Sequence, residues 1–240
     1  MKYNLCSLQF TTTQDYDLNL QTLLKLLQDT PQKSVVVAPE VCLTGFDYER
    51  FDEVLSFASR ATEAIKNAVQ KRIVILTVIE KIDGKIYNMA KIFHDGAIIH
   101  QRGKARLFRF GGENNYFFQE SSERVELIEV AGFKLGVLIC FELRFKLLWQ
   151  KLEGADIIAI PSWWGVLRKE HFKLLTQSLA IINQCYVIAS DSANEECTKL
   201  SGIITPFGVE ERNENRACLQ VDYDKKEVQK MRRYLDVGIG

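Results

Sequence analysis

The stretch 133–145 reads FKLGVLICFELRF, and it decides the fold that we expect for this chain. Its apolar run ends at the thiol of Cys140, and a segment that suits a helix follows. A buried strand that stops at a reactive residue is how α/β proteins present chemistry at the edge of a sheet. We therefore predict a strand over 134–139, a tight turn that carries Cys140, and a helix near 145–152.

Two other apolar runs end in the same way. The stretch 34–46, SVVVAPEVCLTGF, contains Glu40, and the stretch 98–108, IIHQRGKARLF, contains Lys104. A free thiol has a pKa of about 8.5, so a cysteine nucleophile needs a base or a cation beside it at neutral pH. We expect the three side chains to meet within hydrogen-bonding or near-contact range in one pocket.

Each of these residues also has a structural interpretation. Glu40 could cap the following loop through backbone hydrogen bonds, and Cys140 could be a buried structural thiol. Lys104 could belong to a solvated basic loop. That loop would contain Arg102, Lys104, Arg106 and Arg109.

Composition limits the function classes. The 240 residues are 47% hydrophobic, enough for a full core, and we interpret residues 1–240 as one domain. Lys plus Arg and Asp plus Glu both number 31, which indicates no nucleic-acid or membrane partner. The sequence shows no signal peptide and no apolar run long enough to span a membrane, so we expect a cytoplasmic protein.

The cysteines and histidines indicate neither disulfides nor a metal site. The six cysteines form no C-x-x-C pair, and the three histidines form no H-E-x-x-H motif. We therefore expect reduced thiols, no metal and no cofactor. The cysteines stand at positions 6, 42, 140, 185, 197 and 218, and the histidines at 94, 100 and 171.

Hydrophobic periodicity predicts strands alternating with helices. A leucine stripe over 18–27 indicates a first helix, and Asp-Gly turns at 83–84 and 95–96 predict an antiparallel meander. Periodicity is lost over 102–122, where aromatic residues indicate a functional loop. The strands are expected at 3–10, 35–38, 73–79, 86–93, 97–101, 125–130, 134–139, 157–160, 186–190, 200–205 and 216–222, and the further helices at 53–70, 145–152 and 169–184.

With these three motifs in order, the chain resembles the nitrilase superfamily of carbon–nitrogen hydrolases from about residue 1 to residue 222. The resemblance implies a four-layer αββα sandwich with mixed sheets, and a Glu40, Lys104 and Cys140 triad supported by Glu113 in FGGENNYFF. Cys140 would attack an amide carbonyl while Glu40 takes the thiol proton, ammonia would leave, and water would hydrolyse the thioester. Lys104 and the backbone N–H of Phe141 would stabilise the oxyanion.

The chain departs from the family pattern around the triad. The family commonly reads C-Y-D-x-R-F-P-E after the nucleophile and K-x-H-L around the lysine. Here Glu142 stands for the aspartate, Lys146 and Leu147 for Pro-Glu, and Arg106 for the histidine. No triad member is lost, so these changes bear on the substrate rather than on the reaction class.

The short chain looks most like the ω-amidase branch, which acts on monoamides of dicarboxylates. Arg144 could bind a substrate carboxylate through its planar fork, or it could orient the turn through a salt bridge. Trp163 and Trp164 could wall the pocket or fill the core. His171 could pair with Cys140 as in papain-like enzymes, although the apolar face of its segment argues against this.

Other functions and an assembly follow from the same resemblance. The alternatives are an N-carbamoyl amino acid amidohydrolase, a nitrilase, or a non-catalytic scaffold that only binds or assembles. The resemblance also implies a homodimer or higher oligomer that pairs through the segment after the nucleophile. In that segment Phe145, Leu148 and Trp149 could contact a partner or their own sheet.

Overall fold

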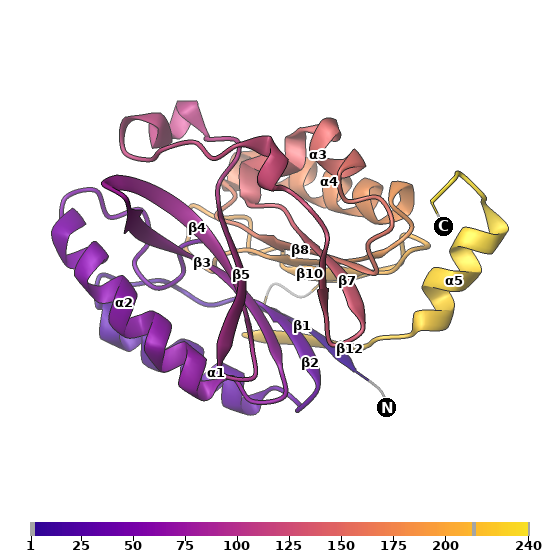
Figure 1. Ribbon diagram of the computed structural model, residues 1–240, viewed down its shortest axis with the longest axis horizontal. Coiled ribbons are helices and arrows are strands. Elements are labelled where there is room, and N and C mark those ends of the chain that lie inside the picture. The colour runs from indigo at the N-terminus through magenta and orange to yellow at the C-terminus, as the bar shows by residue number, and fades with distance from the viewer. Residues whose placement is uncertain (1–2, 213–214, 240) are drawn as a thin grey trace.

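Two six-stranded mixed sheets packed face to face form the centre of the computed structural model, which describes residues 3–212 and 215–239 (Figure 1). The first sheet has the order β12-β1-β2-β3-β4-β5 and the second the order β11-β10-β9-β8-β7-β6. The first contains β12 (Cys218–Asp222), β1 (Asn4–Leu8), β2 (Ser34–Val37), β3 (Ile73–Ile82), β4 (Lys85–His94) and β5 (Ala97–Gly103). The second contains β11 (Glu210–Arg212), β10 (Gly202–Ile204), β9 (Tyr186–Ser190), β8 (Ile157–Pro161), β7 (Phe133–Val137) and β6 (Ile128–Val130).

Helices cover the outer face of each sheet. α1 (Tyr16–Asp29) and α2 (Phe51–Ala68) lie on the first sheet, and α3 (Lys146–Gln150) and α4 (Lys169–Ile182) lie on the second (Figure 1). The molecule is therefore an αββα sandwich, which confirms the predicted fold class.

Burial on both faces explains the all-apolar sequence of β2. Val35 and Val37 pack between the sheets, while Val36 points the other way, among the residues that pack against α1 and α2. β2 pairs in parallel with both β1 and β3. Parallel strands covered on both faces need apolar side chains at successive positions.

The predicted meander is also confirmed. β3 pairs antiparallel with β4, and β4 with β5. The two turns are Asp83-Gly84 and Asp95-Gly96, and all four residues have positive φ, between 44° and 79°. Such turns match the twist of the flanking strands, and glycine enters them without steric cost.

The structure differs from the expected elements at several places. β6 and α3 are shorter than predicted, β5 extends to Gly103, and neither β11 nor α5 (Lys225–Tyr234) was predicted. α5 begins after Asp224, whose side chain accepts a hydrogen bond from the N–H of Lys226. Because only Val228 and Met231 of this charged helix are buried, its apolar periodicity is weak.

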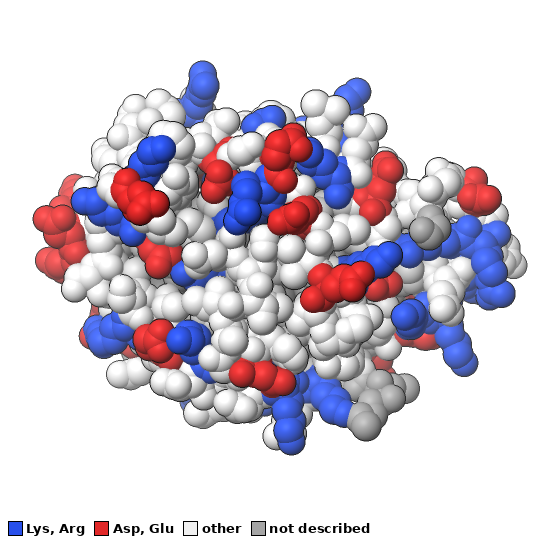
Figure 2. All heavy atoms as spheres, viewed as in Figure 1, with Lys and Arg blue, Asp and Glu red and all other residues white. Residues whose placement is uncertain are grey.

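Charges of both signs are mixed on the surface, and no described helix is suited to span a membrane. On the face shown in Figure 2, Lys and Arg are interspersed with Asp and Glu. Across residues 3–212 and 215–239, no helix is both long enough and apolar enough to cross a bilayer.

Candidate active site

Three strand ends bring the predicted residues together. β2 and β5 of the first sheet are followed by Glu40 and Lys104, and β7 of the second sheet is followed by Cys140. The candidate site therefore lies where the two sheets face each other, at one end of the sandwich. Its remaining carboxylate, Glu113, comes from the loop after β5 as the sequence predicted.

Lys104 connects the two carboxylates. Its Nζ lies 2.6 Å from Oε1 of Glu40 and 2.7 Å from Oε1 of Glu113. Glu40 and Lys104 have no solvent exposure, and Glu113 is 4% exposed. Glu113 is itself held because its Oε2 accepts the N–H of Phe108 at 2.9 Å. The solvated-loop interpretation of Lys104 is therefore wrong.

The remaining hydrogen bonds to Glu40 fix its orientation toward the thiol. Asn88 Nδ2 donates to Oε1 at 2.7 Å, and the N–H of Trp163 donates to Oε2 at 3.1 Å. Cys140 Sγ lies 3.7 Å from the carbonyl oxygen of Trp163, the same residue whose N–H binds Glu40. The charges of Glu40 and Lys104 both act on the Cys140 thiol, as expected for side chains of one pocket.

The turns at Glu40 and Cys140 each contain a residue in the left-handed region. Cys140 has φ 44° and Val41, directly after Glu40, has φ 43°. A β-branched residue rarely adopts this conformation, which costs on the order of 1–3 kcal/mol and occurs mainly at functional sites. The N–H of Val41 donates to Oγ1 of Thr77 at 2.7 Å, which helps hold the strained turn.

The turn at Cys140 also exposes backbone donors. Cys140 begins a short 3₁₀ helix, Cys140–Arg144, and Phe141 is its second residue. The first N–H groups of a helical turn have no acceptor within that turn, so the N–H of Phe141 has the place expected of an oxyanion donor.

A buried ion pair ties the nucleophile turn to the lysine segment. Arg102 binds both carboxylate oxygens of Glu142, at 2.9 and 2.6 Å, and both residues are almost fully buried. Oε1 of Glu142 accepts the N–H of Ala105 at 2.5 Å, and Oε2 accepts the N–H of Ile139 at 2.7 Å. One carboxylate therefore fixes the neighbours of both Lys104 and Cys140. From the sequence, Glu142 was recognised only as a departure from the family pattern and Arg102 only as a loop residue.

Burial shifts the ionisation of the site. Burial raises the pKa of Glu40, although the charge of Lys104 opposes this effect. For Lys104, burial acts in the lowering direction, but the charges of Glu40 and Glu113 outweigh it and raise the pKa. Burial and the charge of Glu40 raise the pKa of the Cys140 thiol well above its ordinary value, although Lys104 opposes them. The raised pKa of Cys140 favours the neutral thiol over the thiolate.

The two tryptophans have different roles. Trp163 is half-buried, lies on the pocket wall and contacts Glu40 and Cys140 through its backbone. Trp164 is mostly core, 3% exposed, although it too lines the pocket. Its N–H donates to Oδ1 of Asp191 at 2.7 Å, and burial raises the pKa of that carboxyl to about 7.

A narrow pocket opens beside the thiol, with a volume of about 20 Å³. Arg144 lies on its wall, but its guanidinium makes no salt bridge that would orient the turn within the described chain. Instead Nη2 lies 3.1 Å from Nδ1 of His171. The His171 contact is therefore with Arg144 rather than with Cys140. The pocket is lined by Phe108, Cys140, Phe141, Arg144, Trp163, Trp164, Gly165 and Arg168.

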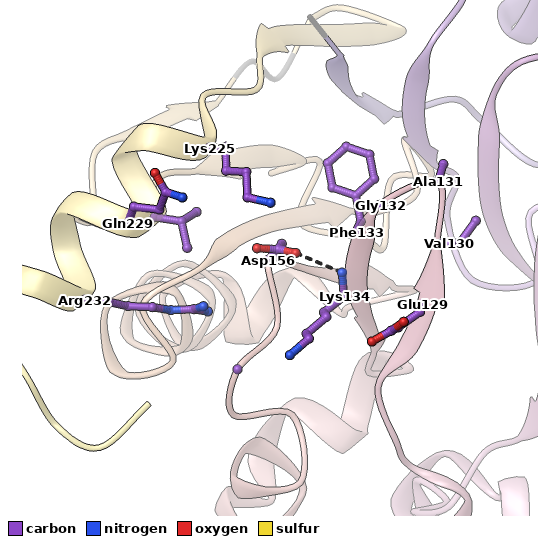
Figure 3. A pocket seen from close by; sticks show the side chains of 12 residues that line it. Glu129, Val130, Ala131, Gly132, Phe133, Lys134, Asp156, Lys225, Gln229 and Arg232 are labelled. Atoms are coloured by element: carbon purple, nitrogen blue, oxygen red, sulfur yellow. Dashed lines mark hydrogen bonds between the residues drawn. The ribbon is translucent and has the colours of Figure 1, made fainter. Parts of the chain in front are cut away.

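A second hollow of about 450 Å³ lies away from the thiol, between α5 and the β6–β7 hairpin (Figure 3). α5 presents Lys225 and Arg232 on one side, and the hairpin presents Glu129 and Lys134 on the other. Its described lining contains no cysteine, so it offers no nucleophile. The described residues also contain no cluster of three or more His, Cys, Asp or Glu side chains suited to a metal ion.

Comparison with known proteins assigns the family. The sequence model of carbon–nitrogen hydrolases matches residues 5–220, nearly the whole chain. The chain belongs to the carbon–nitrogen hydrolase family. It is accordingly a hydrolase of carbon–nitrogen bonds, as the three motifs predicted.

Individual relatives match this chain over almost their whole length. The chain is 27% identical to a deaminated glutathione amidase of Escherichia coli O157:H7, covering 95% of this chain and 93% of the relative. It is 28% identical to a 2-oxoglutaramate amidase of Bacillus subtilis (strain 168), covering 99% and 96%. Its fold resembles that of a CN-hydrolase superfamily protein from Xanthomonas campestris, which carries an arsenic adduct in its active site. The two structures have a TM-score of 0.87 and 20% sequence identity, and the match covers 98% of this chain and 96% of the other.

Proposed function

We propose that this protein is an amidase that cleaves a small linear amide through a thioester on Cys140. The observation that carries the proposal is the buried Glu40 carboxylate, which pairs with the Lys104 ammonium at 2.6 Å and binds the backbone of Trp163, the residue that the Cys140 thiol also contacts. A neutral thiol beside a carboxylate of raised pKa is suited to general-base catalysis, because the proton can move as the sulfur attacks.

The proposed cycle begins when Sγ of Cys140 bonds to the amide carbon and Glu40 takes the thiol proton. The carbonyl oxygen becomes an oxyanion, stabilised by Lys104 Nζ and the N–H of Phe141. Glu40 then gives its proton to the leaving nitrogen, the C–N bond breaks and ammonia departs. In the second half Glu40 removes a proton from water, hydroxide adds to the thioester, and the acid leaves as the thiol is restored.

Lys104 and Glu113 have supporting roles in this proposal. Two carboxylates around Lys104 keep it protonated and fix its Nζ, so the positive charge is in place before the oxyanion forms. Within the described chain, the side-chain carboxylate of Glu113 hydrogen-bonds only to Lys104 and to the N–H of Phe108, so we assign it a positioning role.

We propose monoamides of dicarboxylates as substrates, in line with an ω-amidase. The names of the relatives point to amides that carry carboxylates. Arg144, four residues after the nucleophile and on the pocket wall, is suited to bind such a carboxylate. Neither a metal nor an organic cofactor is required by the cycle.

Ammonia release from a substrate panel tests the proposal. Glutaramate and 2-oxoglutaramate should be hydrolysed much faster than N-carbamoyl amino acids or nitriles. Preference for a carbamoyl compound or a nitrile would replace the amidase assignment by one of those activities. Absence of turnover on every amide, in protein whose Cys140 is reduced, would instead support the non-catalytic scaffold.

We also propose that two copies of the chain pair through α3, α4 and the turn before α4. Leu167, Leu174 and Ile181 recur every seven residues and are 93%, 56% and 41% exposed, so they form one apolar stripe. Leu147 of α3 is 64% exposed. The stripe differs from the expected one, because Leu148 and Trp149 are buried in the chain's own core.

A single domain and a cytoplasmic location complete the proposal. The single domain is supported by one cluster of buried residues that contains Val35 and Ile75 of the first sheet together with Leu135 and Ile157 of the second. The location is supported by the six cysteines, which are all free thiols.

A further inference from the structure

Arg168 places a second guanidinium beside Cys140, and no motif in the sequence pointed to it. It ends the short 3₁₀ helix Val166–Arg168 and lines the same pocket as Cys140 and Arg144. We propose that Arg168 and Arg144 together form a clamp that binds one carboxylate of the substrate between their guanidinium groups. The inference rests on the proposed amidase function and adds the residue that would make it selective for anionic amides.

Aromatic rings hold both guanidinium groups against the pocket wall. Cζ of Arg168 lies 5.3 Å from the ring centroid of Phe108, and Cζ of Arg144 lies 4.9 Å from that of Trp164. A stacked guanidinium keeps its N–H edges available for planar, bidentate hydrogen bonds to a carboxylate. The backbone of Arg168 is also fixed, because its carbonyl accepts Nε1–H of Trp164 at 2.9 Å.

The charge of this pair is not balanced by the protein. Neither arginine forms an ion pair with a carboxylate in the parts of the chain that the structure describes, and the residues that line the pocket include no Asp or Glu. Burial and the charge of Arg168 lower the pKa of Arg144. An anion placed between the two groups would relieve their repulsion.

Because Gly165 has no side chain, the guanidinium of Arg168 can lie directly beside it. A Cβ at Gly165 would lie 2.7 Å from Nη2 of Arg168, although the φ of −61° suits any residue. A side chain here would therefore push the Arg168 guanidinium aside without straining the backbone. The variant Gly165→Ala thus displaces the guanidinium without removing its charge.

The test compares two amides of nearly equal shape. Glutaramate carries a carboxylate, whereas glutaramide carries an uncharged amide in its place. The preference for glutaramate, given by the ratio of the kcat/KM values, should fall roughly tenfold or more in Arg168→Gln, since a charge-assisted hydrogen bond is worth about that factor or more. The loss should appear mainly in KM for glutaramate, and glutaramide should be nearly unaffected.

Two further variants separate the clamp from other effects. Gly165→Ala should reduce the preference in the same direction as Arg168→Gln. Arg109→Gln removes the same charge from an exposed position that lines a neighbouring hollow, and it should leave the preference unchanged. If Arg109→Gln reduces the preference as strongly as Arg168→Gln, the effect is one of general surface charge and the clamp is refuted.

Binding without turnover keeps this inference distinct from the amidase proposal. Glutarate should bind to Cys140→Ala in calorimetry, and adding Arg168→Gln or Arg144→Gln should weaken binding by roughly tenfold each. The two losses should be non-additive, because both groups hold one carboxylate. If amides are turned over but Arg168→Gln slows charged and neutral substrates equally, the clamp is refuted and the amidase proposal stands. If glutarate binds through both arginines but no amide is cleaved, the amidase proposal is refuted instead.

Discussion

Glu40 is a buried carboxylate that must lose and regain a proton in each half of the proposed cycle. Because burial raises its pKa, activity should fall on the acid side at a higher pH than the value of about 4.3 for an ordinary glutamate. The negative charge of Glu40 also raises the pKa of the thiol. The two groups are therefore suited to share one proton.

This coupling predicts opposite effects of Glu40→Gln on two reactions. Removing the carboxylate charge leaves Lys104 to stabilise the thiolate, so the pKa of Cys140 should fall and alkylation by iodoacetamide at neutral pH should become faster. Amide hydrolysis should fall by roughly 10²–10⁴-fold, because the general base is lost.

Alkylation rates across about pH 6–10, followed by mass spectrometry, check the direction. The surface variant Asp17→Asn is the control and should leave the profile unchanged, because this carboxylate pairs with the exposed Arg60. A profile for Glu40→Gln that moves to higher pH would refute the proposed electrostatic role of Glu40.

At the scale of elements, the Arg102–Glu142 pair joins the end of β5 to the turn after β7. Breaking a buried pair by removing one partner typically costs about 3–5 kcal/mol, because an unpaired charge stays buried. Glu142→Gln should therefore lower the free energy of unfolding by about that amount. It should also reduce kcat, since the backbone beside Lys104 and Cys140 loses a shared acceptor.

Urea denaturation and steady-state kinetics measure the two effects. Glu142→Asp keeps the charge, so it should cost less stability than Glu142→Gln. Arg60→Gln is the control, because its ion pair with Asp17 is exposed and should contribute less than about 1 kcal/mol. Equal stability losses for Glu142→Gln and Arg60→Gln would contradict the structural role of the buried pair.

The sequence predicted these elements to different degrees, for physical reasons. Long apolar runs that end at a reactive residue drew attention to Glu40 and Cys140, because strand burial leaves a clear pattern, whereas Lys104 was assigned through the family resemblance. Arg102 and Glu142 were misjudged, because a charged residue carries no sign in the sequence of a partner 40 positions away. Arg168 lies in a short 3₁₀ turn without periodicity, and α5 buries too few residues to produce a pattern.

At the scale of the whole molecule, the exposed stripe on α4 predicts assembly. Leu174→Lys places a charge at the centre of the stripe, so it should convert the proposed dimer into a monomer while the fold is kept. Light scattering at micromolar concentration measures the mass. Val237→Lys, at an exposed apolar residue near the other end of the chain, is the control and should remain dimeric. A wild-type protein that is already monomeric would contradict the proposed interface.

The central claim is that Cys140 carries the acyl group during turnover. Acid quenching of the enzyme while it hydrolyses glutaramate, followed by peptide mass spectrometry, tests it most directly. We predict a glutaryl thioester on the peptide that contains Cys140, and its absence in Cys140→Ala, which should stay folded but lose ammonia release by roughly 10⁴-fold or more. An acyl group on another residue, or ammonia release by folded Cys140→Ala at the wild-type rate, would contradict the account.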